Sequence, residues 1–235
     1  MDVAAGVVGV SADELGPLPD EIMVDPEAGW IEPRAWFGEC AERPFEIEIG
    51  SGKGSFLLQQ AALEPGVNYL GIEWAGEFYA YTADRLRRSG LTNVRMLNAD
   101  ATEFLHWRCP SGIARVIHLY FSDPWPKKRH HKKRVVQDTF MADAHRVLLP
   151  GGELRVVTDH DEYWAWMEDV YSRWTSVPGD SAQGDSEQAV ESSFERRDFE
   201  VPQSAGEGEI VGTNFERKYR REGRPFHACV LRKIG

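Results

Sequence analysis

Short apolar runs alternate with helical patterns from Phe45 onward, and this alternation is the main structural signal of the chain. Apolar runs of this length, separated by helices, predict a parallel, doubly wound sheet. The predicted strands are 45–49, 69–72, 94–97, 116–121, 154–157 and 226–231. The predicted helices are 54–62, 77–88, 134–148, 161–174 and 214–221. We therefore expect an α/β fold whose mostly parallel sheet carries helices on both faces.

Two segments interrupt this pattern. Residues 1–43 are acidic, contain four prolines and lack a sustained period, which predicts an irregular leader before a main domain at 44–235. Residues 176–193 are rich in Ser, Gly and acids, and we expect a mobile insertion there. With 235 residues, 42% of them apolar, the chain is long enough for one α/β domain with a sizeable core.

The sequence contains no sign of a membrane segment or an export signal. No apolar run reaches the roughly 18 residues that a spanning helix needs, and the N-terminus lacks a basic start followed by an apolar stretch. We expect a cytoplasmic protein with no membrane partner. Its three cysteines are scattered and form no C-x-x-C pair, so neither a disulfide framework nor a metal site is expected. Monomer and homodimer both stay open.

Opposite charges gather in different parts of the chain. The formal net charge of -11 argues against a polyanionic partner, because phosphate binding generally needs clustered Lys and Arg. Residues 1–50, however, hold twelve acids and two bases, and residues 176–212 hold nine acids and two bases. Residues 213–235 hold seven bases and two acids. A basic face can therefore exist on this acidic protein.

A glycine-rich turn follows the first predicted strand, with Gly50, Gly52 and Gly54 in the sequence E-I-G-S-G-K-G. Glycines let the backbone approach a ligand closely, and amides at the next helix start favour an anionic group such as a carboxylate. The spacing is G-x-G-x-G, whereas dinucleotide sites use G-x-G-x-x-G beneath a pyrophosphate. Glu48, just before the turn, would repel a pyrophosphate and attract an ammonium or sulfonium cation.

Two further acids end the next predicted strands. Glu73 lies 23 residues after Gly50, where a carboxylate can accept hydrogen bonds from both hydroxyls of a ribose. Asp100, which precedes Ala101, is placed to accept a hydrogen bond from an adenine amino group, although a helix cap has the same appearance. Together with Glu48, these acids predict a site for an adenosine-bearing cofactor.

The fourth predicted strand leads into F-S-D-P-W-P-K-K-R-H-H-K-K-R at 121–134. Prolines on both sides of Trp125 stiffen the loop, so Asp123 and Trp125 are expected in a fixed geometry. Six bases in eight residues beside an aromatic ring favour an RNA backbone with a stacked base over a solvated helix entry. The predicted RNA-contacting residues are Lys127, Arg129, His130, His131, Lys132, Lys133 and Arg134.

These motifs resemble those of the bacterial tRNA (guanine-N7)-methyltransferases. The resemblance covers roughly Phe45 to the C-terminus and rests on residues 48–54, 71–73, 123–134, T-D at 158–159 and T-N-F-E at 213–216. It implies a Rossmann-like methyltransferase fold, S-adenosylmethionine as methyl donor and tRNA as substrate. It also implies that the donor is bound by Glu48, Glu73, Asp100 and Asp123, with Asp123 catalytic. The residues implied to contact RNA are Lys127, Asp159, Thr213, Asn214, Phe215 and Glu216.

The sequence departs from the family's pattern in three places. Ser122 stands where the family usually has proline, the leader lacks a basic run, and the acidic stretch at 176–193 is longer than usual. T-N-F-E is also a capping-box sequence, so Thr213 and Glu216 are expected to start a basic helix near the site. A substrate-binding helix and strand are expected within 213–232.

The reaction implied by the resemblance is methylation of N7 of a guanosine in the tRNA variable region, at position 46 of tRNA. N7 carries a lone pair and no proton, so the attack needs alignment and no general base. We therefore expect Asp123 to orient the cofactor or the guanine and to offset positive charge. Three alternatives stay open: a methyltransferase for small molecules or protein side chains, a nicotinamide-dependent oxidoreductase, and a non-catalytic RNA-binding subunit.

Overall fold

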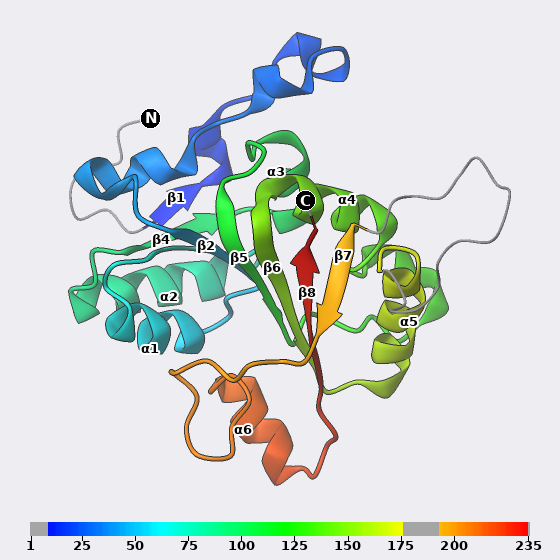
Figure 1. The fold of residues 1–235 in the computed structure, drawn as a ribbon. Coiled ribbons are helices and arrows are strands. Elements are labelled where there is room, and N and C mark those ends of the chain that lie inside the picture. The colour runs from blue at the N-terminus through cyan, green and yellow to red at the C-terminus, as the bar shows by residue number, and fades with distance from the viewer. Residues whose placement is uncertain (1–8, 176–192, 235) are drawn as a thin grey trace, which may run out of the picture.

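The computed structural model describes residues 9–175 and 193–234, and this part of the chain forms one eight-stranded sheet (Figure 1). The strand order is β1-β4-β3-β2-β5-β6-β8-β7. Among these strands only β8 runs in the opposite direction, so its pairings with β6 and β7 are antiparallel. The expected mostly parallel, doubly wound fold is confirmed. The strands are β1 (Gly9–Ser11), β2 (Phe45–Ile49), β3 (Asn68–Ile72), β4 (Val94–Asn98), β5 (Ala114–Tyr120), β6 (Leu148–Thr158), β7 (Phe194–Arg197) and β8 (His227–Lys233).

Six α-helices accompany the sheet in the described ranges. They are α1 (Ser55–Leu63), α2 (Gly76–Ser89), α3 (Ala101–Trp107), α4 (Asp138–Val147), α5 (Asp161–Ser172) and α6 (Asn214–Arg221). The sequence pattern misses α3, because its seven residues give fewer than two turns of periodicity. The helix predicted at 134–148 begins only at Asp138, since Lys128–Lys133 form the 3-10 helix η5 and Arg134 is extended.

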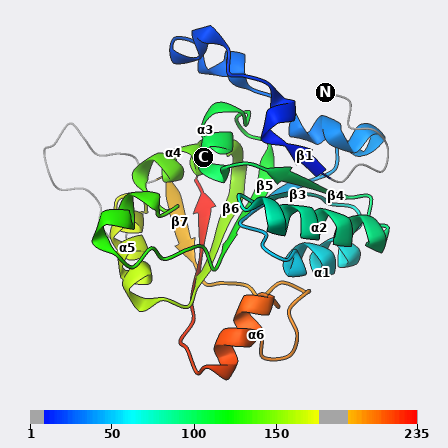
Figure 2. The same ribbon diagram turned by 180° about the vertical axis from the view of Figure 1, so that it is seen from behind.

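Side chains alternate across β2 and separate two cores. Phe45, Ile47 and Ile49 join the core that α3, α4 and α5 complete. The intervening acids, Glu46 and Glu48, point to the opposite face, where residues of α1 and α2 form the second core. The helices therefore cover both faces of the sheet (Figures 1 and 2). Each fully buried aliphatic or aromatic side chain contributes about 1.5–3 kcal/mol to this packing.

The carboxyl ends of the parallel strands meet at one edge of the sheet. The strand order reverses between β2 and β5, and open α/β sheets bind ligands outside the carboxyl ends at such a reversal. Figure 1 shows α6 lying beyond this edge, below the sheet, whereas most of the N-terminal segment lies toward the opposite end. The fold thus brings the C-terminal basic helix to the edge where the predicted site residues end their strands.

The described part of the leader, residues 9–43, is more ordered than its sequence indicates. It contains β1 and four 3-10 helices, η1 (Ala12–Leu15), η2 (Asp20–Met23), η3 (Pro26–Gly29) and η4 (Pro33–Cys40). β1 pairs in parallel with β4. The sequence does not predict this strand, because three residues are too few to show a period. Arg108 also donates a hydrogen bond to the carbonyl oxygen of Gly16 at 2.6 Å. The insertion predicted at 176–193 lies, except for its last residue, outside the described residues.

Candidate active site

The glycine-rich turn joins β2 to α1 at the carboxyl edge. Gly50, Gly52 and Gly54 have φ angles of 74°, 51° and 66°, in the left-handed region that favours glycine. Two side chains hold the middle of the turn. The hydroxyl of Thr82 donates to the Gly52 carbonyl at 2.7 Å, and the Glu73 carboxylate accepts from the Gly52 amide at 2.8 Å. The turn is therefore fixed before any ligand arrives.

The carboxylate of Glu48 is buried against this turn. The residue is 4% exposed, and its Oε2 has no hydrogen-bond partner among the described residues. The buried hydroxyl of Ser51 lies beside this carboxylate and lowers its pKa, although the two groups do not form a hydrogen bond of normal geometry. Burial has the larger effect and raises the pKa of Glu48 to about 8, and the neighbouring Glu73 carboxylate acts in the same direction. A ligand cation would supply the missing partner and stabilise the ionised form, so this position fits an ammonium or sulfonium group.

Glu48 lines a pocket of about 330 Å³, which we call the turn pocket. This volume falls in the range of roughly 300–1,000 Å³ that small-molecule sites occupy. Its walls are the glycine-rich turn, Phe56 of α1, Tyr120 of β5 and the start of α6. Thr213, Asn214 and Phe215 are part of this wall. Motifs separated by about 160 residues of sequence thus meet around one cavity.

Glu73 connects the turn pocket with a second cavity. Its Oε2 binds the Gly52 amide, and its Oε1 accepts a hydrogen bond from the Ala75 amide at 2.9 Å. Its main-chain carbonyl accepts from the side-chain amide of Asn98 at 2.7 Å, and Asn98 lines the second cavity. Glu73 lines neither pocket itself, but it is hydrogen-bonded to one wall residue of each, Gly52 and Asn98.

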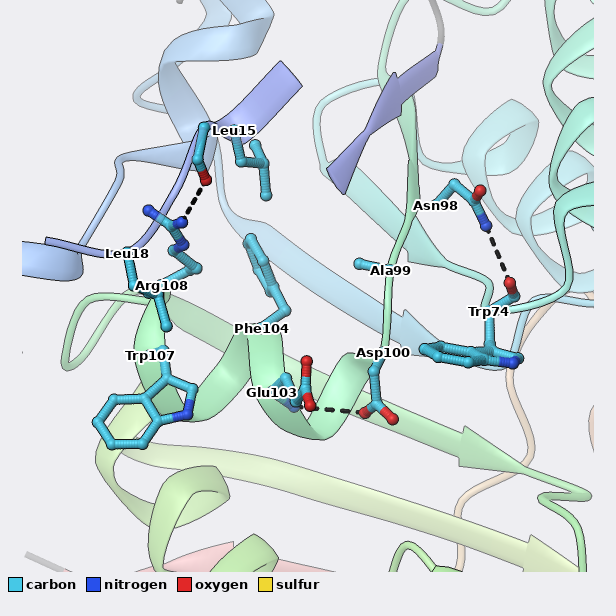
Figure 3. A pocket seen from close by; sticks show the side chains of 11 residues that line it. Leu15, Leu18, Trp74, Asn98, Ala99, Asp100, Glu103, Phe104, Trp107 and Arg108 are labelled. Atoms are coloured by element: carbon cyan, nitrogen blue, oxygen red, sulfur yellow. Dashed lines mark hydrogen bonds between the residues drawn. The ribbon is translucent and has the colours of Figure 1, made fainter. Parts of the chain in front are cut away.

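The second cavity, which we call the leader pocket, measures about 430 Å³ (Figure 3). Leu15 and Leu18 of the leader and Phe104 of α3 form its apolar side. In Figure 3 the indole of Trp74 extends toward Asp100. Trp74 is 72% exposed, so a large aromatic face is available beside an acid. Such a pocket fits a flat, apolar ring with a hydrogen-bond donor at its edge.

Asp100 acts in the structure as the N-cap of α3, which begins at Ala101. Its Oδ1 accepts from the Thr102 amide at 2.8 Å, from the Thr102 hydroxyl at 2.6 Å and from the Glu103 amide at 3.3 Å. The alternative cap interpretation therefore applies. Cap and ligand roles are compatible, because all these bonds use Oδ1 and the residue also lines the leader pocket.

Asp123 lies in a strained loop after β5. Two residues near the ends of the loop, Phe121 and Trp125, have φ angles of 56° and 42° without being glycine. Each such residue costs on the order of 1–3 kcal/mol, and this kind of strain clusters at functional sites. The ring of Phe121 packs against Phe226 at 5.8 Å, and the ammonium of Lys133 lies 4.7 Å from the Trp125 ring centre. Asp123 itself is exposed.

The basic segment after this loop presents most of its charges to solvent. The exposed residues are Lys127, Lys128, Arg129, Lys132 and Lys133. His130 packs edge-on against Trp125 with ring centres 5.7 Å apart. His131 is half-buried, with its Nε2 3.4 Å from Glu162 Oε1. The segment thus forms an exposed basic surface beside Asp123.

Arg134 lies apart from the exposed bases that precede it in the sequence. The residue is only 2% exposed, and its Nε donates to the Pro124 carbonyl at 2.9 Å. A buried guanidinium cannot reach a phosphate in this conformation. The sequence pattern groups it with five exposed bases, because a run of bases carries no information about which of them points inward.

The T-N-F-E motif shows the same division of roles. The Thr213 hydroxyl accepts from the Glu216 amide at 3.1 Å and caps α6, as the capping pattern predicts. Glu216 is fully buried, however, and its Oε2 accepts from the amides of Val211 and Gly212, each at 2.9 Å. In this structure the Glu216 carboxylate folds the preceding loop, and its contact with RNA stays a prediction. Asn214 and Phe215 remain exposed at the turn pocket.

Asp159, at the end of β6, is tied to the segment after α6. Its Oδ2 accepts from Arg224 at 2.7 Å, and the Arg224 guanidinium lies 4.0 Å from the Tyr219 ring centre. Tyr219 also packs against Phe121, with ring centres 6.3 Å apart. Asp159 therefore helps to hold α6 against the carboxyl edge.

Sequence reasoning misses several residues that line the two pockets. Trp74 follows Glu73 directly, and an exposed tryptophan at a strand end is a signal that could have identified it. The hydroxyl of Ser51 lies within the glycine motif. Leu15 and Leu18 carry no such signal, because only the folded leader brings them to α3.

No helix in residues 9–175 and 193–234 has the length and apolar character to cross a membrane. The same ranges contain no group of three or more His, Cys, Asp or Glu side chains arranged to hold a metal ion.

The strand order, the glycine-rich turn and the acids at three strand ends define a Rossmann-like methyltransferase. Solved structures support this class at the level of the fold. The aminoglycoside resistance methyltransferase NpmB1 matches with a TM-score of 0.56 and 17% identity, covering 87% of this chain and 95% of that one. TrmN from Thermus thermophilus matches with a TM-score of 0.51 and 17% identity, covering 86% of this chain and 49% of that one.

Sequence comparisons identify the family. A family model described as "Putative methyltransferase" matches residues 42–228. A protein of Geobacillus thermodenitrificans named tRNA (guanine-N(7)-)-methyltransferase is 34% identical over 220 residues, covering 92% of this chain and 91% of the relative. A protein of the same name from Halorhodospira halophila is 32% identical, covering 88% of this chain and 81% of the relative. The chain belongs to the tRNA (guanine-N7)-methyltransferase family.

Proposed function

We propose that the chain transfers a methyl group from S-adenosylmethionine to N7 of a guanosine in tRNA, within the variable region. The observation that carries the proposal is the buried Glu48 carboxylate, whose Oε2 is unpartnered in a pocket shared with the glycine-rich turn and the start of α6. This arrangement suits a cationic cofactor and disfavours the pyrophosphate of a nicotinamide dinucleotide. A tRNA substrate fits the predicted cytoplasmic location.

The donor fits across three neighbouring strand ends. Glu48 would hold its ammonium group in the turn pocket, and the start of α1 at Ser55, which lines the same pocket, would favour its carboxylate group. Glu73, which is hydrogen-bonded to Gly52 of the turn pocket and Asn98 of the leader pocket, would accept hydrogen bonds from the ribose hydroxyls. Asp100 and Trp74 would receive the adenine in the leader pocket, which Leu15 and Leu18 close on its apolar side. The leader is therefore part of the proposed donor site.

The RNA surface follows from the exposed charges at the same edge. Lys127, Arg129, Lys132 and Lys133 would contact phosphates, and exposed Phe215 offers a face for stacking a base. Asn214, next to Phe215 on the turn-pocket wall, offers an amide that can hydrogen-bond an RNA base or sugar. The basic surface favours an RNA substrate over a small molecule or a protein side chain.

The chemistry requires alignment and charge stabilisation. When bound, S-adenosylmethionine supplies an electrophilic methyl carbon on a sulfonium sulfur. The strained 121–125 loop carries Asp123 two residues after Phe121, which lines the turn pocket, and the Asp123 carboxylate would orient the guanine and offset the positive charge that N7 alkylation creates. No side chain needs to remove a proton, because N7 carries none. Phe121 and Tyr120 line the turn pocket and limit the access of water.

One assay tests the proposal against its alternatives. The protein is incubated with donor labelled in the methyl group and with bulk tRNA, and the RNA is then digested to nucleosides. We expect label in 7-methylguanosine, with a tRNA lacking the variable-region guanosine as the unlabelled control. Label in another nucleoside would assign a different target, and unlabelled RNA with intact donor binding would support a non-catalytic RNA-binding role.

A further inference from the structure

The loop that carries Asp123 is held at a point between its two strained residues. Phe121 and Trp125 both have positive φ, so this backbone shape persists only if its surroundings enforce it. The ring of Phe121 is held by its contacts with the rings of Phe226 and Tyr219. Between them, the Pro124 carbonyl accepts a hydrogen bond from Arg134 Nε at 2.9 Å. That carbonyl belongs to the residue after Asp123.

The Arg134 side chain is held by burial, by two aromatic rings and by an ion pair. It is 1% exposed, and its guanidinium carbon lies 5.2 Å from the Tyr163 ring centre and 5.1 Å from the Trp166 ring centre. Its second terminal nitrogen donates to Glu162 Oε1 at 3.0 Å. All three partners belong to α5, which therefore forms a platform for the guanidinium.

The same platform binds the loop through a neighbouring hydroxyl. The Tyr163 hydroxyl accepts from the Ser122 hydroxyl at 3.5 Å and from the Val136 amide at 3.4 Å. The indole nitrogen of Trp166 donates to the Val136 carbonyl at 2.8 Å. Residues on both sides of Asp123, Ser122 and Pro124, are thus attached to α5.

Burying an arginine costs desolvation free energy, and well-packed apolar residues often stabilise a fold equally well. Arginine offers here what lysine does not: a planar group that stacks on two rings while donating in two directions. We propose that Arg134 is a positioning residue for the methyl transfer, fixing the Pro124 carbonyl and thereby the direction of the Asp123 carboxylate. This inference rests on the proposed function.

The test compares Arg134→Lys and Arg134→Ala with wild-type protein and with Arg173→Lys. Arg173 directly follows α5, is half-exposed and pairs with Asp138 and Asp169 on the surface, which makes it a matched control. For each protein, kcat and KM are measured with tRNA, the Kd of the donor by calorimetry, and the Kd of tRNA at several salt concentrations.

We expect both Arg134 variants to lose at least tenfold in kcat, since small misplacements near reacting groups have effects of this size. The Kd of the donor, the Kd of tRNA and its salt dependence should stay within threefold of wild type, as should every value for Arg173→Lys. A purely structural role would lower folded protein and binding together, and would leave kcat per folded molecule unchanged.

A folded Arg134→Lys protein with kcat within twofold of wild type would overturn the inference. A second result would also overturn it. If Arg134→Ala keeps its kcat but the salt dependence of its tRNA binding falls by the amount expected for about one phosphate contact, Arg134 contacts RNA. If Arg134→Ala does not fold, Arg134→Lys decides alone. Because wild-type 7-methylguanosine formation is measured in the same assay, failure of the proposed function is recognised separately.

Discussion

At the scale of single residues, Glu48 links ligand binding to protonation. Burial raises the pKa of its carboxyl group to about 8, so the free protein holds a proton there at neutral pH. A cationic donor binds the ionised form more tightly. Donor binding should therefore release a proton, and the affinity should rise with pH until it levels off near the pKa of about 8.

This predicts a specific pH profile. Below the pKa, the Kd of S-adenosylmethionine should fall by up to about tenfold for each pH unit, as one-proton linkage requires. Calorimetry at pH 7 in two buffers with different ionisation enthalpies would count the released protons, and we expect nearly one per donor bound. Glu48→Gln should bind weakly at every pH and release none. A Kd of the wild type that is flat between pH 6 and 8 would contradict the prediction.

The same shift has the opposite effect on stability. A carboxyl whose pKa is raised on folding contributes stability that is fully present below the unfolded pKa of about 4.5 and is lost as pH rises through the folded pKa of about 8. In the ligand-free protein, Glu48→Gln should therefore raise the melting temperature at pH 8 more than at pH 5. Equal melting temperatures for variant and wild type at both pH values would count against the buried, unpartnered state of Glu48.

Asp123 is the residue whose loss should separate chemistry from folding. It is exposed and makes no hydrogen bond that the structure records among the described residues, so its replacement should leave stability unchanged. Asp123→Asn should lower kcat by about 100-fold or more, the usual effect of removing one group that stabilises developing charge. Melting temperature and donor Kd provide the controls. Near-normal turnover would remove Asp123 from the proposed catalytic role.

At the scale of elements, Glu216 determines how α6 meets the glycine-rich turn. Its carboxylate accepts from the amides of Ile210, Val211 and Gly212, which fold the loop before the helix. Leaving such buried amides without partners costs about 1–3 kcal/mol each. Thr213 contributes a single cap bond, which is typically worth about 1 kcal/mol.

Glu216→Gln should therefore weaken donor and tRNA binding together, because the loop leads directly into the start of α6, which forms part of the wall of the turn pocket. We expect the Kd of each ligand to rise by about tenfold, which corresponds to roughly 1.4 kcal/mol. Thr213→Ala should have a smaller effect, and Glu77→Gln on the exposed first turn of α2 should have none. A rise in the tRNA Kd alone would instead assign Glu216 a direct contact with RNA.

The elements were predictable where a period or a cap was present, and not elsewhere. The strands from Phe45 to Ile49 and from Val94 to Leu97 follow from their apolar runs, and α6 follows from its capping sequence with both ends correct. β1 and β7 have three and four residues, too few for a period. The leader pocket was not predictable, since a contact between Leu15 and α3 exists only after folding.

The candidate site divides in the same way. Glu48, Glu73 and Asp100 could be placed because each ends a predicted strand, and parallel strands end at one edge. The basic run at 127–134 was predicted as a unit, yet the structure separates its exposed lysines from the buried Arg134. Burial within such a run depends on α5, whose aromatic residues lie about 30 residues further along the chain.

At the scale of the whole molecule, the fold separates basic from acidic surfaces, which allows an acidic protein to bind a polyanion. The net charge is -11, yet the exposed bases of η5 and the basic residues of α6 gather at the carboxyl edge. Most of the acidic leader lies toward the opposite end of the sheet (Figure 1). Because exposed charges are screened beyond about 8–10 Å, the local basic surface governs contact with RNA more than the net charge does.

This distribution predicts where salt acts. Replacing both Lys132 and Lys133 with alanine should weaken tRNA binding and lower the slope of log K against log salt by about 1.5, since each lost phosphate contact on RNA contributes roughly 0.7–0.9. Donor binding should not change, because neither side chain lines the turn pocket or the leader pocket.

The control replaces Arg87 and Arg88 with alanine. These arginines are both 62% exposed and lie at the end of α2, so they remove the same formal charge from a different surface. If RNA binding depended on net charge, the two double variants would show the same slope. A slope lowered only by the change at Lys132 and Lys133 places the RNA on the carboxyl edge, and an unchanged slope in that variant would move it to another face.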